Sequence, residues 1–224
     1  MPEKHQINKS VKTNWAEQNL LHNRLFSLGD VVPIRSFTIP TMVNEPLEGF
    51  KDLWQTYNPR DKENSRFGIP ITSHDGNIID PISLDSLRQY NKEHGTHYTE
   101  HDFNIFTPIV KLIPSIQSLL SLFEGHIGRS HFLRLSKGGH FPPHRDSVYN
   151  TSFRVLVPLT FDPYKTFFML EETPLNLQNG QAYVINTVKR HTVISLKNHM
   201  DMIVLNVQLN QYTVDTIYHL LDGI

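Results

Sequence analysis

The sequence contains no cysteine, so a disulfide framework, a thiolate metal site and a cysteine nucleophile are all excluded. It also has no apolar run close to the roughly 20 residues that a membrane-spanning helix needs. The first ten residues, MPEKHQINKS, lack the apolar core of a signal peptide. These absences predict a cytoplasmic protein without a membrane partner.

An excess of charge of one sign is also missing. The 21 Lys and Arg residues nearly balance the 22 Asp and Glu residues, and the formal net charge is -1. A protein that neutralises a phosphate backbone needs a basic surface, so we expect no nucleic-acid partner. The 224 residues, 38% of them hydrophobic, can bury one sizeable core. No repeat or linker divides them, and we expect a single domain over residues 1–224.

The first half of the chain has mainly helical patterns. Apolar residues recur at helical spacing in four segments, residues 14–28, 48–57, 83–93 and 113–123. Ser83 is a suitable cap for the third segment, and Pro114 suits the first turn of the fourth. Residues 31–39 and 67–71 have an extended pattern instead. We expect residues 1–124 to form a helical and irregular layer.

The second half changes to short β-strands. Six apolar segments are separated by turn sequences such as SKGG and LQNG. They are residues 131–135, 153–159, 166–170, 182–185, 191–196 and 202–209. Strands at this spacing, without helices between them, are typical of a β-sandwich or a small barrel. The expected layout is a β core over residues 125–212 followed by a C-terminal helix over residues 213–224.

One motif in the β core carries metal chemistry. His144 and Asp146 are two residues apart, so in an extended segment both side chains lie on the same face. A facial triad of two imidazoles and one carboxylate needs a second histidine. His191 follows 47 residues later, at the head of a predicted strand. Each residue also has a structural alternative, because an H-x-D can be an exposed turn pair and a lone histidine can belong to the core.

The surrounding sequence narrows the interpretation. The segments that carry the resemblance are LRLSKGGHFPPHRD (133–146), FRVLVPL (153–159), FFML (167–170), NGQAYVIN (179–186) and HTV (191–193). In this order they resemble the Fe(II)/2-oxoglutarate oxygenases, and in detail the aspartyl/asparaginyl β-hydroxylase family. The resemblance covers residues 107–209, and residues 1 to about 100 have no counterpart.

The resemblance implies a fold, a reaction and a site. The implied fold is a double-stranded β-helix (jelly-roll or cupin-like), mainly β with an α layer. The implied reaction is hydroxylation of an unactivated C–H bond by O2, Fe(II) and 2-oxoglutarate, with His144, Asp146 and His191 as metal ligands. Some family members have glycine in place of the carboxylate, and the presence of Asp146 favours a full triad. The short N-terminal layer favours a small-molecule or amino-acid-type substrate.

The anchor for 2-oxoglutarate is where the sequence departs from the family. The distal carboxylate of the acid needs an arginine or a lysine, and Arg154 matches the family arginine on the strand after the metal motif. The family has a further arginine after the distal histidine, where this chain has Met202. Arg154 could act alone, Lys197 or Arg134 could replace the missing arginine, or the co-substrate could be different. Arg154 could also be a strand arginine paired with a carboxylate.

Several other residues have weaker functional interpretations. Substrate contacts are conceivable for Ser147, Tyr149, Asn150, Asn186 and His140, and metal binding for His94, His97 and His101 or for His199 with Asp201. Four aromatic residues are expected in the core or barrel lining, namely Trp15, Trp54, Phe167 and Phe168. Two rival functions stay open: a cupin-like metalloenzyme that does not use 2-oxoglutarate, and a binding barrel without turnover.

Overall fold

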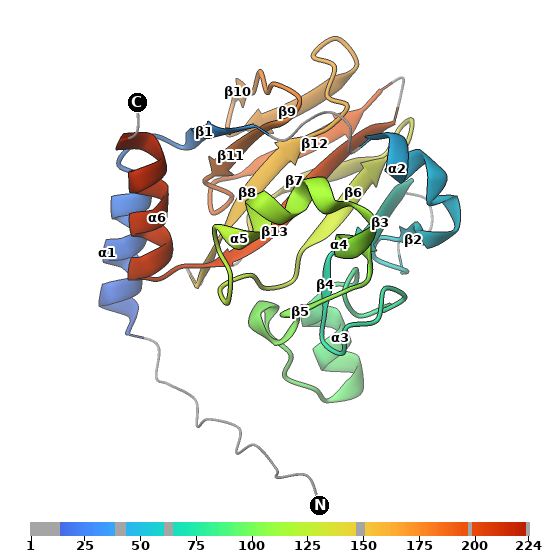
Figure 1. Ribbon diagram of the computed structural model, residues 1–224. Coiled ribbons are helices and arrows are strands. Elements are labelled where there is room, and N and C mark those ends of the chain that lie inside the picture. The colour runs from blue at the N-terminus through green and yellow to red at the C-terminus, as the bar shows by residue number, and fades with distance from the viewer. Residues whose placement is uncertain (1–13, 39–43, 61–64, 147–150, 197–198, 223–224) are drawn as a thin grey trace, which may run out of the picture.

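A computed structural model describes residues 14–38, 44–60, 65–146, 151–196 and 199–222. Two antiparallel β-sheets face each other, and helices cover the outer side of the larger sheet (Figure 1). The termini of the described chain lie together, because helix α1 (Trp15–Phe26) contacts helix α6 (Gln211–Asp222). The Tyr218 hydroxyl donates to the carbonyl of Arg24 at 2.7 Å and fixes this contact.

The larger sheet has seven strands. In spatial order they are β1 (Val31–Thr38), β11 (Gln181–Ile185), β8 (Ser152–Pro158), β13 (Met200–Gln208), β6 (His131–Leu135), β3 (Arg66–Pro70) and β2 (Gln55–Thr56). The smaller sheet contains β10 (Thr173–Pro174), β9 (Thr166–Leu170), β12 (His191–Ser195) and β7 (His140–His144). A separate hairpin pairs β4 (Thr72–Ser73) with β5 (Ile105–Phe106).

Strand β13 explains how two cores are built around one sheet. Its residues alternate between faces: Met202 and Val204 pack between the two sheets, whereas Ile203 and Leu205 pack against the helices. A strand buried on both faces has a continuous apolar run instead of an alternating pattern, as the segment MIVLNV does. The fold is a double-stranded β-helix, and the strands described do not close it into one continuous barrel.

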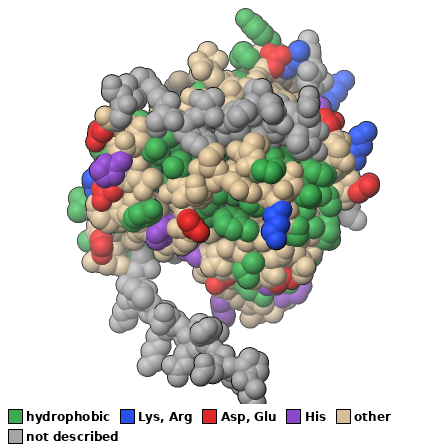
Figure 2. Space-filling model, in the orientation of Figure 1, with side chains coloured by type: hydrophobic (Ala, Val, Ile, Leu, Met, Phe, Trp, Pro, Cys, Tyr) green, Lys and Arg blue, Asp and Glu red, His purple; other side chains and the backbone are tan. Residues whose placement is uncertain are grey.

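The remaining helices are short. They are α2 (Asn44–Gly49), α3 (Leu87–His94), α4 (Ile109–Leu112) and α5 (Gln117–Ser121), with 3-10 turns at Lys51–Leu53, Glu100–Asp102 and Pro114–Ile116. None of the helices described is both long and apolar enough to cross a bilayer. Figure 2 shows apolar, acidic, basic and histidine side chains interspersed on the face in view, without a broad area of one charge among the coloured residues.

The six predicted strands of the β core are confirmed, as are the helix at 14–28, the C-terminal helix, which the structure describes over Gln211–Asp222, and the strand at 67–71. The predicted helix at 48–57 is wrong, because this segment ends α2 and continues through a 3-10 turn into β2. Helix α3 begins later than predicted: Ser83 donates to Asp80 in a turn, and Ser86 caps the helix instead.

The predicted helix at 113–123 is broken into a 3-10 turn and the short α5. Strand β7 was not predicted because it contains Pro142 and Pro143. Proline is tolerated in a strand at the edge of a sheet, and β7 is the edge strand of the smaller sheet. The N-terminal layer also contributes β1, β2 and β3 to the larger sheet, a role that its sequence did not indicate. The single-domain interpretation stays a prediction.

Candidate metal centre

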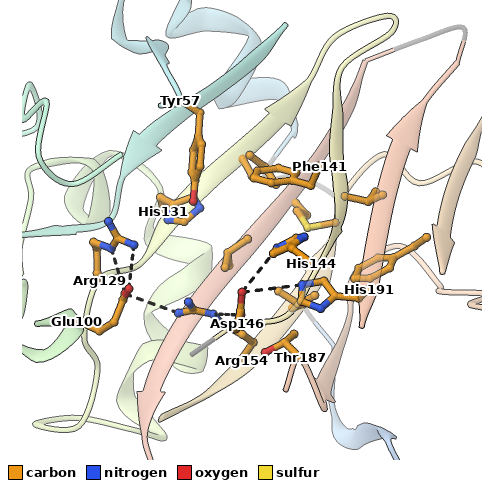
Figure 3. A pocket seen from close by; sticks show the side chains of 16 residues that line it. Tyr57, Glu100, Arg129, His131, Phe141, His144, Asp146, Arg154, Thr187 and His191 are labelled. Atoms are coloured by element: carbon orange, nitrogen blue, oxygen red, sulfur yellow. Dashed lines mark hydrogen bonds and ion pairs between the residues drawn. The ribbon is translucent and has the colours of Figure 1, made fainter. Parts of the chain in front are cut away.

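The structure brings His144, Asp146 and His191 together at one end of the space between the two sheets (Figure 3). His144 ends β7 and His191 begins β12, and the two residues are direct partners in the antiparallel ladder. Their ring centroids are 4.2 Å apart. Asp146 Oδ1 lies 3.7 Å from His144 Nε2 and 3.9 Å from His191 Nε2. One donor atom of each residue therefore faces a common point.

Both imidazoles are oriented by backbone carbonyls. The Nδ1 of His144 is 2.8 Å from the carbonyl of Pro142, and the Nδ1 of His191 is 3.0 Å from the carbonyl of Lys189. A carbonyl only accepts, so each Nδ1 carries the proton and each Nε2 presents its lone pair to the common point. Burial lowers the pKa of His191 despite the nearby carboxylate of Asp146, which favours the neutral form that binds metals.

Asp146 is held by three contacts just beyond the end of β7. Its backbone N–H donates to the carbonyl of Thr187 at 2.9 Å, and the Thr187 side chain also hydrogen-bonds to its carboxylate. The Nε of Arg154 donates to Oδ2 at 3.0 Å, which leaves Oδ1 for the histidines. Burial alone would raise the pKa of Asp146, but the charge of Arg154 and the hydrogen bonds from Arg154 and Thr187 hold that pKa below its usual range.

Behind Arg154 lies a second ion pair. Glu100 Oε2 is 3.8 Å from Arg154 Nη1, and Arg129 donates to both oxygens of Glu100, at 3.0 and 2.8 Å. The amide of Asn206 adds a further bond to Glu100 at 2.7 Å. Burial opposes ionisation of Glu100, but Arg129 and Arg154 hold its pKa below the usual range. The four charged groups form an alternating network that ends at Asp146 (Figure 3).

A cavity opens from the metal centre into the space between the sheets. Besides the three candidate ligands, its lining includes Tyr57, Glu100, Arg129, His131, Leu133, Phe141, Arg154, Leu156, Phe168, Thr187, Val193, Met202 and Val204. A separate, wider cleft reaches the same centre from outside and shares Glu100, Asp146, Arg154 and Thr187 with the cavity. Helix α3 and Trp15 line the outer part of this cleft.

The structure pairs Arg154 with a carboxylate, as the structural alternative for this residue predicted. Arg154 lies in the cavity, as a co-substrate anchor should, but it is bonded to the candidate ligand Asp146. Of the alternatives, Arg134 faces away from the cavity, since it packs over Trp54 and is bonded to Asp201. Lys197 lies outside the described residues. Met202 lines the cavity, so the departure from the family pattern occurs within the site.

Among the described residues, the weaker candidates are not brought to the metal centre. His140 is exposed, and the side chain of Asn186 donates to Asp30. His94, His97 and His101 do not form a metal cluster in the part of the chain that is described. Ser147, Tyr149 and Asn150 lie outside the described residues.

His199 and Asp201 do lie together, with Glu48 as a third member. Both oxygens of Asp201 already accept hydrogen bonds from Arg134, at 2.7 and 2.6 Å. This second cluster is therefore an ion-pair network rather than an open metal site.

The aromatic predictions are partly correct. Phe168 lies between the sheets with 3% of its surface exposed, whereas the adjacent Phe167 is 42% exposed because neighbouring strand residues point to opposite faces. Trp54 packs against the helix-side core. Trp15 is 48% exposed and lines the outer cleft instead of the core.

A sequence model of the aspartyl/asparaginyl β-hydroxylases matches residues 86–211. The match includes the three candidate ligands and both ion pairs behind them, and it covers more than half of the chain. The chain belongs to the aspartyl/asparaginyl β-hydroxylase family. The match begins before residue 107, where the resemblance in the sequence became apparent, and so includes Glu100. No curated protein sequence matches the chain.

Solved structures show more distant similarity to this hydroxylase family member. A prolyl-4-hydroxylase from Pseudomonas putida is 11% identical with a TM-score of 0.47, over 86% of this chain and 98% of the other. KdgF from a Halomonas species is 15% identical with a TM-score of 0.30, over 38% and 71%. A predicted oxalate decarboxylase from Thermotoga maritima is 10% identical with a TM-score of 0.32, over 40% and 74%.

Several cavity residues were missed in the sequence. Glu100 and Arg129 lie in segments without a recognisable motif. Tyr57 follows β2 and His131 begins β6, and neither is near the H-x-D motif in the sequence. The buried ion pair of Glu100 and Arg129 could not be predicted from the sequence, because its two members are 29 residues apart. Thr187 could have been suspected from its place just before the distal histidine.

Proposed function

We propose that this hydroxylase family member is an Fe(II)-dependent dioxygenase that hydroxylates an unactivated C–H bond of a small-molecule or amino-acid-type substrate. A 2-oxo acid would supply the two electrons. One atom of O2 enters the substrate as hydroxyl, and the other enters the acid, which leaves as CO2 and a carboxylic acid one carbon shorter. The observation that carries the proposal is the convergence of two Nε2 atoms and one Oδ1 on a single point beside a cavity.

The donor set fits iron. Two neutral imidazoles and one carboxylate on one face are the ligands of mononuclear Fe(II) oxygenases, and they leave positions free for the acid and for O2. The two Nδ1–H groups are already bonded to carbonyls, so the lone pairs of His144 and His191 are directed before the metal arrives. Iron bound there would supply the activation of O2.

The chain's own residues have three tasks around that centre. Arg154 and Thr187 fix the carboxylate of Asp146 in the orientation that the metal needs. Glu100 compensates the charge of Arg154, so the guanidinium stays beside Asp146. Phe168, Val193 and the other apolar walls exclude water from the reacting groups.

The sequence resemblance implies that this acid is 2-oxoglutarate. The chelating end would lie at the open positions of the metal. The distal carboxylate would need polar partners deeper in the cavity, where Tyr57 and His131 belong to the lining and the buried guanidinium of Arg66 lies 4.5 Å from the ring centroid of Phe141. Met202, which lines the cavity at the position where the family has an arginine, favours as a second candidate a metalloenzyme that activates O2 without a 2-oxo acid.

The test combines metal binding with turnover. The apoprotein is loaded with Fe(II) without oxygen, and O2 uptake and CO2 release are then followed with a panel of 2-oxo acids and pools of small molecules and amino acids. Iron-dependent O2 uptake coupled to CO2 release supports the proposal, and an Asp146→Ala variant should lack both. Failure to bind Fe(II) would overturn it. O2 uptake without CO2 release would favour the second candidate.

A further inference from the structure

The outer cleft offers more room than the cavity between the sheets. The cavity has a volume of about 90 Å³ and the cleft one of about 510 Å³. Asp146 and Arg154 line both, so the cleft reaches the candidate metal position from outside. Sites for drug-sized ligands commonly measure about 300–1,000 Å³. The cleft can therefore hold the body of a substrate while the cavity remains for a 2-oxo acid.

Helix α3 forms one wall of the cleft. Leu87, Arg88 and Asn91 all line it, because residues three and four apart on a helix lie on the same face. The amide of Asn91 donates to the carbonyl of Tyr98 at 2.8 Å and accepts from its backbone N–H at 3.0 Å. Tyr98, which also lines the cleft, is thus held within one helical turn of Arg88.

The charges at the inner end of the cleft compensate one another. Arg154 lies between Glu100 and Asp146, and Arg129 donates to both oxygens of Glu100 (Figure 3). These two cations and two anions sum to zero charge. Among the described residues of the cleft lining, Arg88 is the remaining charged one, so the cleft favours a ligand with a negative charge.

The guanidinium of Arg88 is available to such a ligand. The nearest acidic side chains of the same segment, Asp85 and Glu93, are both bonded to Arg60 instead. Arg88 is exposed, and no hydrogen bond or ion pair holds it among the residues described. The same is true of the Tyr98 hydroxyl. An arginine binds a carboxylate through two parallel N–H···O bonds, and the tyrosine can donate a third.

This pair of donors stands apart from the metal centre. The backbone of Thr99 is extended, so the Cα atoms of Tyr98 and Glu100 are about 7 Å apart. Glu100 is itself separated from Asp146 by the guanidinium of Arg154. A carboxylate bound by Arg88 and Tyr98 is therefore not a ligand of the metal.

Apolar side chains line the cleft as well. Val188 directly follows Thr187, whose side chain bonds to Asp146, so the apolar surface begins beside the metal centre. Leu87 adds to it on α3, and Trp15 on α1 is 48% exposed where it lines the cleft. An apolar chain or ring placed there gains free energy by burial.

We propose that the outer cleft binds the substrate that is hydroxylated, and that this substrate is an organic carboxylate with an apolar chain or ring. Arg88 and Tyr98 would bond to the carboxylate, and the apolar part would extend along the cleft towards the metal. The inference rests on the proposed iron-dependent function and specifies its substrate class. Arg88 is the residue that sets this class.

The experiment compares 4-phenylbutanoate with 4-phenylbutanamide, which have the same size and differ in charge. Full-length protein, both metal-free and loaded with Co(II), is titrated with each probe by calorimetry. We expect the carboxylate to bind roughly tenfold more tightly, as for hydrogen bonds to a charged group. Tryptophan fluorescence should change on binding. Trp15→Phe should abolish this change, because the other tryptophan, Trp54, packs against the helix-side core.

Variants assign the preference to a residue. Arg88→Gln should weaken binding of the carboxylate about tenfold and leave binding of the amide unchanged. Arg88→Lys should retain part of the preference, because lysine keeps the charge without the paired bonds. Tyr98→Phe should weaken carboxylate binding about threefold. Lys92→Gln, which removes the same charge from α3 outside the cleft lining, is the matched control and should bind both probes like the wild type.

Turnover links the site to the reaction. For a carboxylate that is converted with iron, Arg88→Gln should raise KM about tenfold and change kcat by less than about twofold, because the bond is made equally before and during the reaction. Equal affinity of the wild type for the two probes would overturn the inference. So would a preference that survives Arg88→Gln or that requires Co(II). Binding that depends on Arg88, together with failure to bind Fe(II), would instead overturn the proposed function.

Discussion

The Nε of Arg154 donates to Oδ2 of Asp146 at 3.0 Å, on the side of the carboxylate opposite the two imidazoles. Oδ2 of the carboxylate therefore contacts the guanidinium of Arg154, and Oδ1 faces the candidate metal position. Glu100 on the far side keeps the guanidinium in place. Arg154 is therefore a positioning residue for Asp146, which is a different task from anchoring a distal carboxylate.

This arrangement predicts how Arg154→Gln will behave. Without the guanidinium, the carboxylate of Asp146 loses its orientation, and we expect metal affinity to fall about 10- to 100-fold, as for other partners of metal ligands. Equilibrium dialysis with Co(II) or Fe(II) measures the effect. Arg88→Gln, on an exposed residue of α3, is the matched control. Unchanged metal affinity combined with lost 2-oxo acid affinity would instead make Arg154 the anchor of the co-substrate.

Metal binding should stabilise the folded protein through His144 and His191. A metal present at 100 times its Kd adds about 2.7 kcal/mol to the free energy of unfolding, which corresponds to a Tm rise of roughly 5–10 °C for a chain of this size. Differential scanning fluorimetry with and without metal detects the shift. His144→Ala and His191→Ala should abolish it. His140→Ala, on the same strand but exposed, should retain it.

The strands and the H-x-D pair could be predicted from the sequence because both depend on short-range patterns, whereas His191 was assigned from the family resemblance. The H-x-D spacing and the strand alternation are local, and the ladder then makes His144 and His191 direct partners. The ion pairs behind Asp146 depend on packing instead: Glu100 comes from a 3-10 turn and Arg154 from the centre of the larger sheet. Nothing near either residue indicates the other.

Stability should depend on pH through His131. In the folded protein burial lowers the pKa of His131 from 6.5 to about 3, whereas in the unfolded chain it stays near 6.5. The unfolded state therefore binds one more proton between these values. The contribution of His131 is fully present above pH 6.5 and is lost as pH falls towards 3. At pH 5 the loss is about 2 kcal/mol, from 1.36 kcal/mol per pH unit.

Urea denaturation between pH 7.5 and 5 tests this dependence. His131→Phe retains an aromatic ring against Tyr57, whose ring centroid is 5.2 Å from that of His131. The difference in unfolding free energy between wild type and variant should change by about 2 kcal/mol across this range. A constant difference would mean that the imidazole has the same pKa in the folded and the unfolded protein.

The second cluster, formed by Glu48, His199 and Asp201, should not bind metal. Asp201 already accepts two bonds from Arg134, so only Glu48 and His199, both exposed, are left as ligands. We expect one metal per chain in a Co(II) titration, and an unchanged stoichiometry and affinity in His199→Ala. Two equivalents in the wild type that fall to one in this variant would identify a second site.

Gly128 connects the backbone of the larger sheet to the charged network. A Cβ at this position would lie 2.6 Å from the carbonyl oxygen of Glu100, and that carbonyl accepts a bond from the Arg129 N–H at 2.9 Å. Both groups are backbone, so Gly128→Ala must displace the turn that carries Glu100. We expect a loss of about 1–3 kcal/mol in the free energy of unfolding, as for other overpacked sites. Metal affinity should fall as well, because a displaced Glu100 no longer holds Arg154 against Asp146.

Gly49→Ala, where an added Cβ has no neighbour within 4 Å, should change stability by less than about 0.5 kcal/mol. A destabilised Gly128→Ala variant with wild-type metal affinity would show that Asp146 is oriented without Glu100.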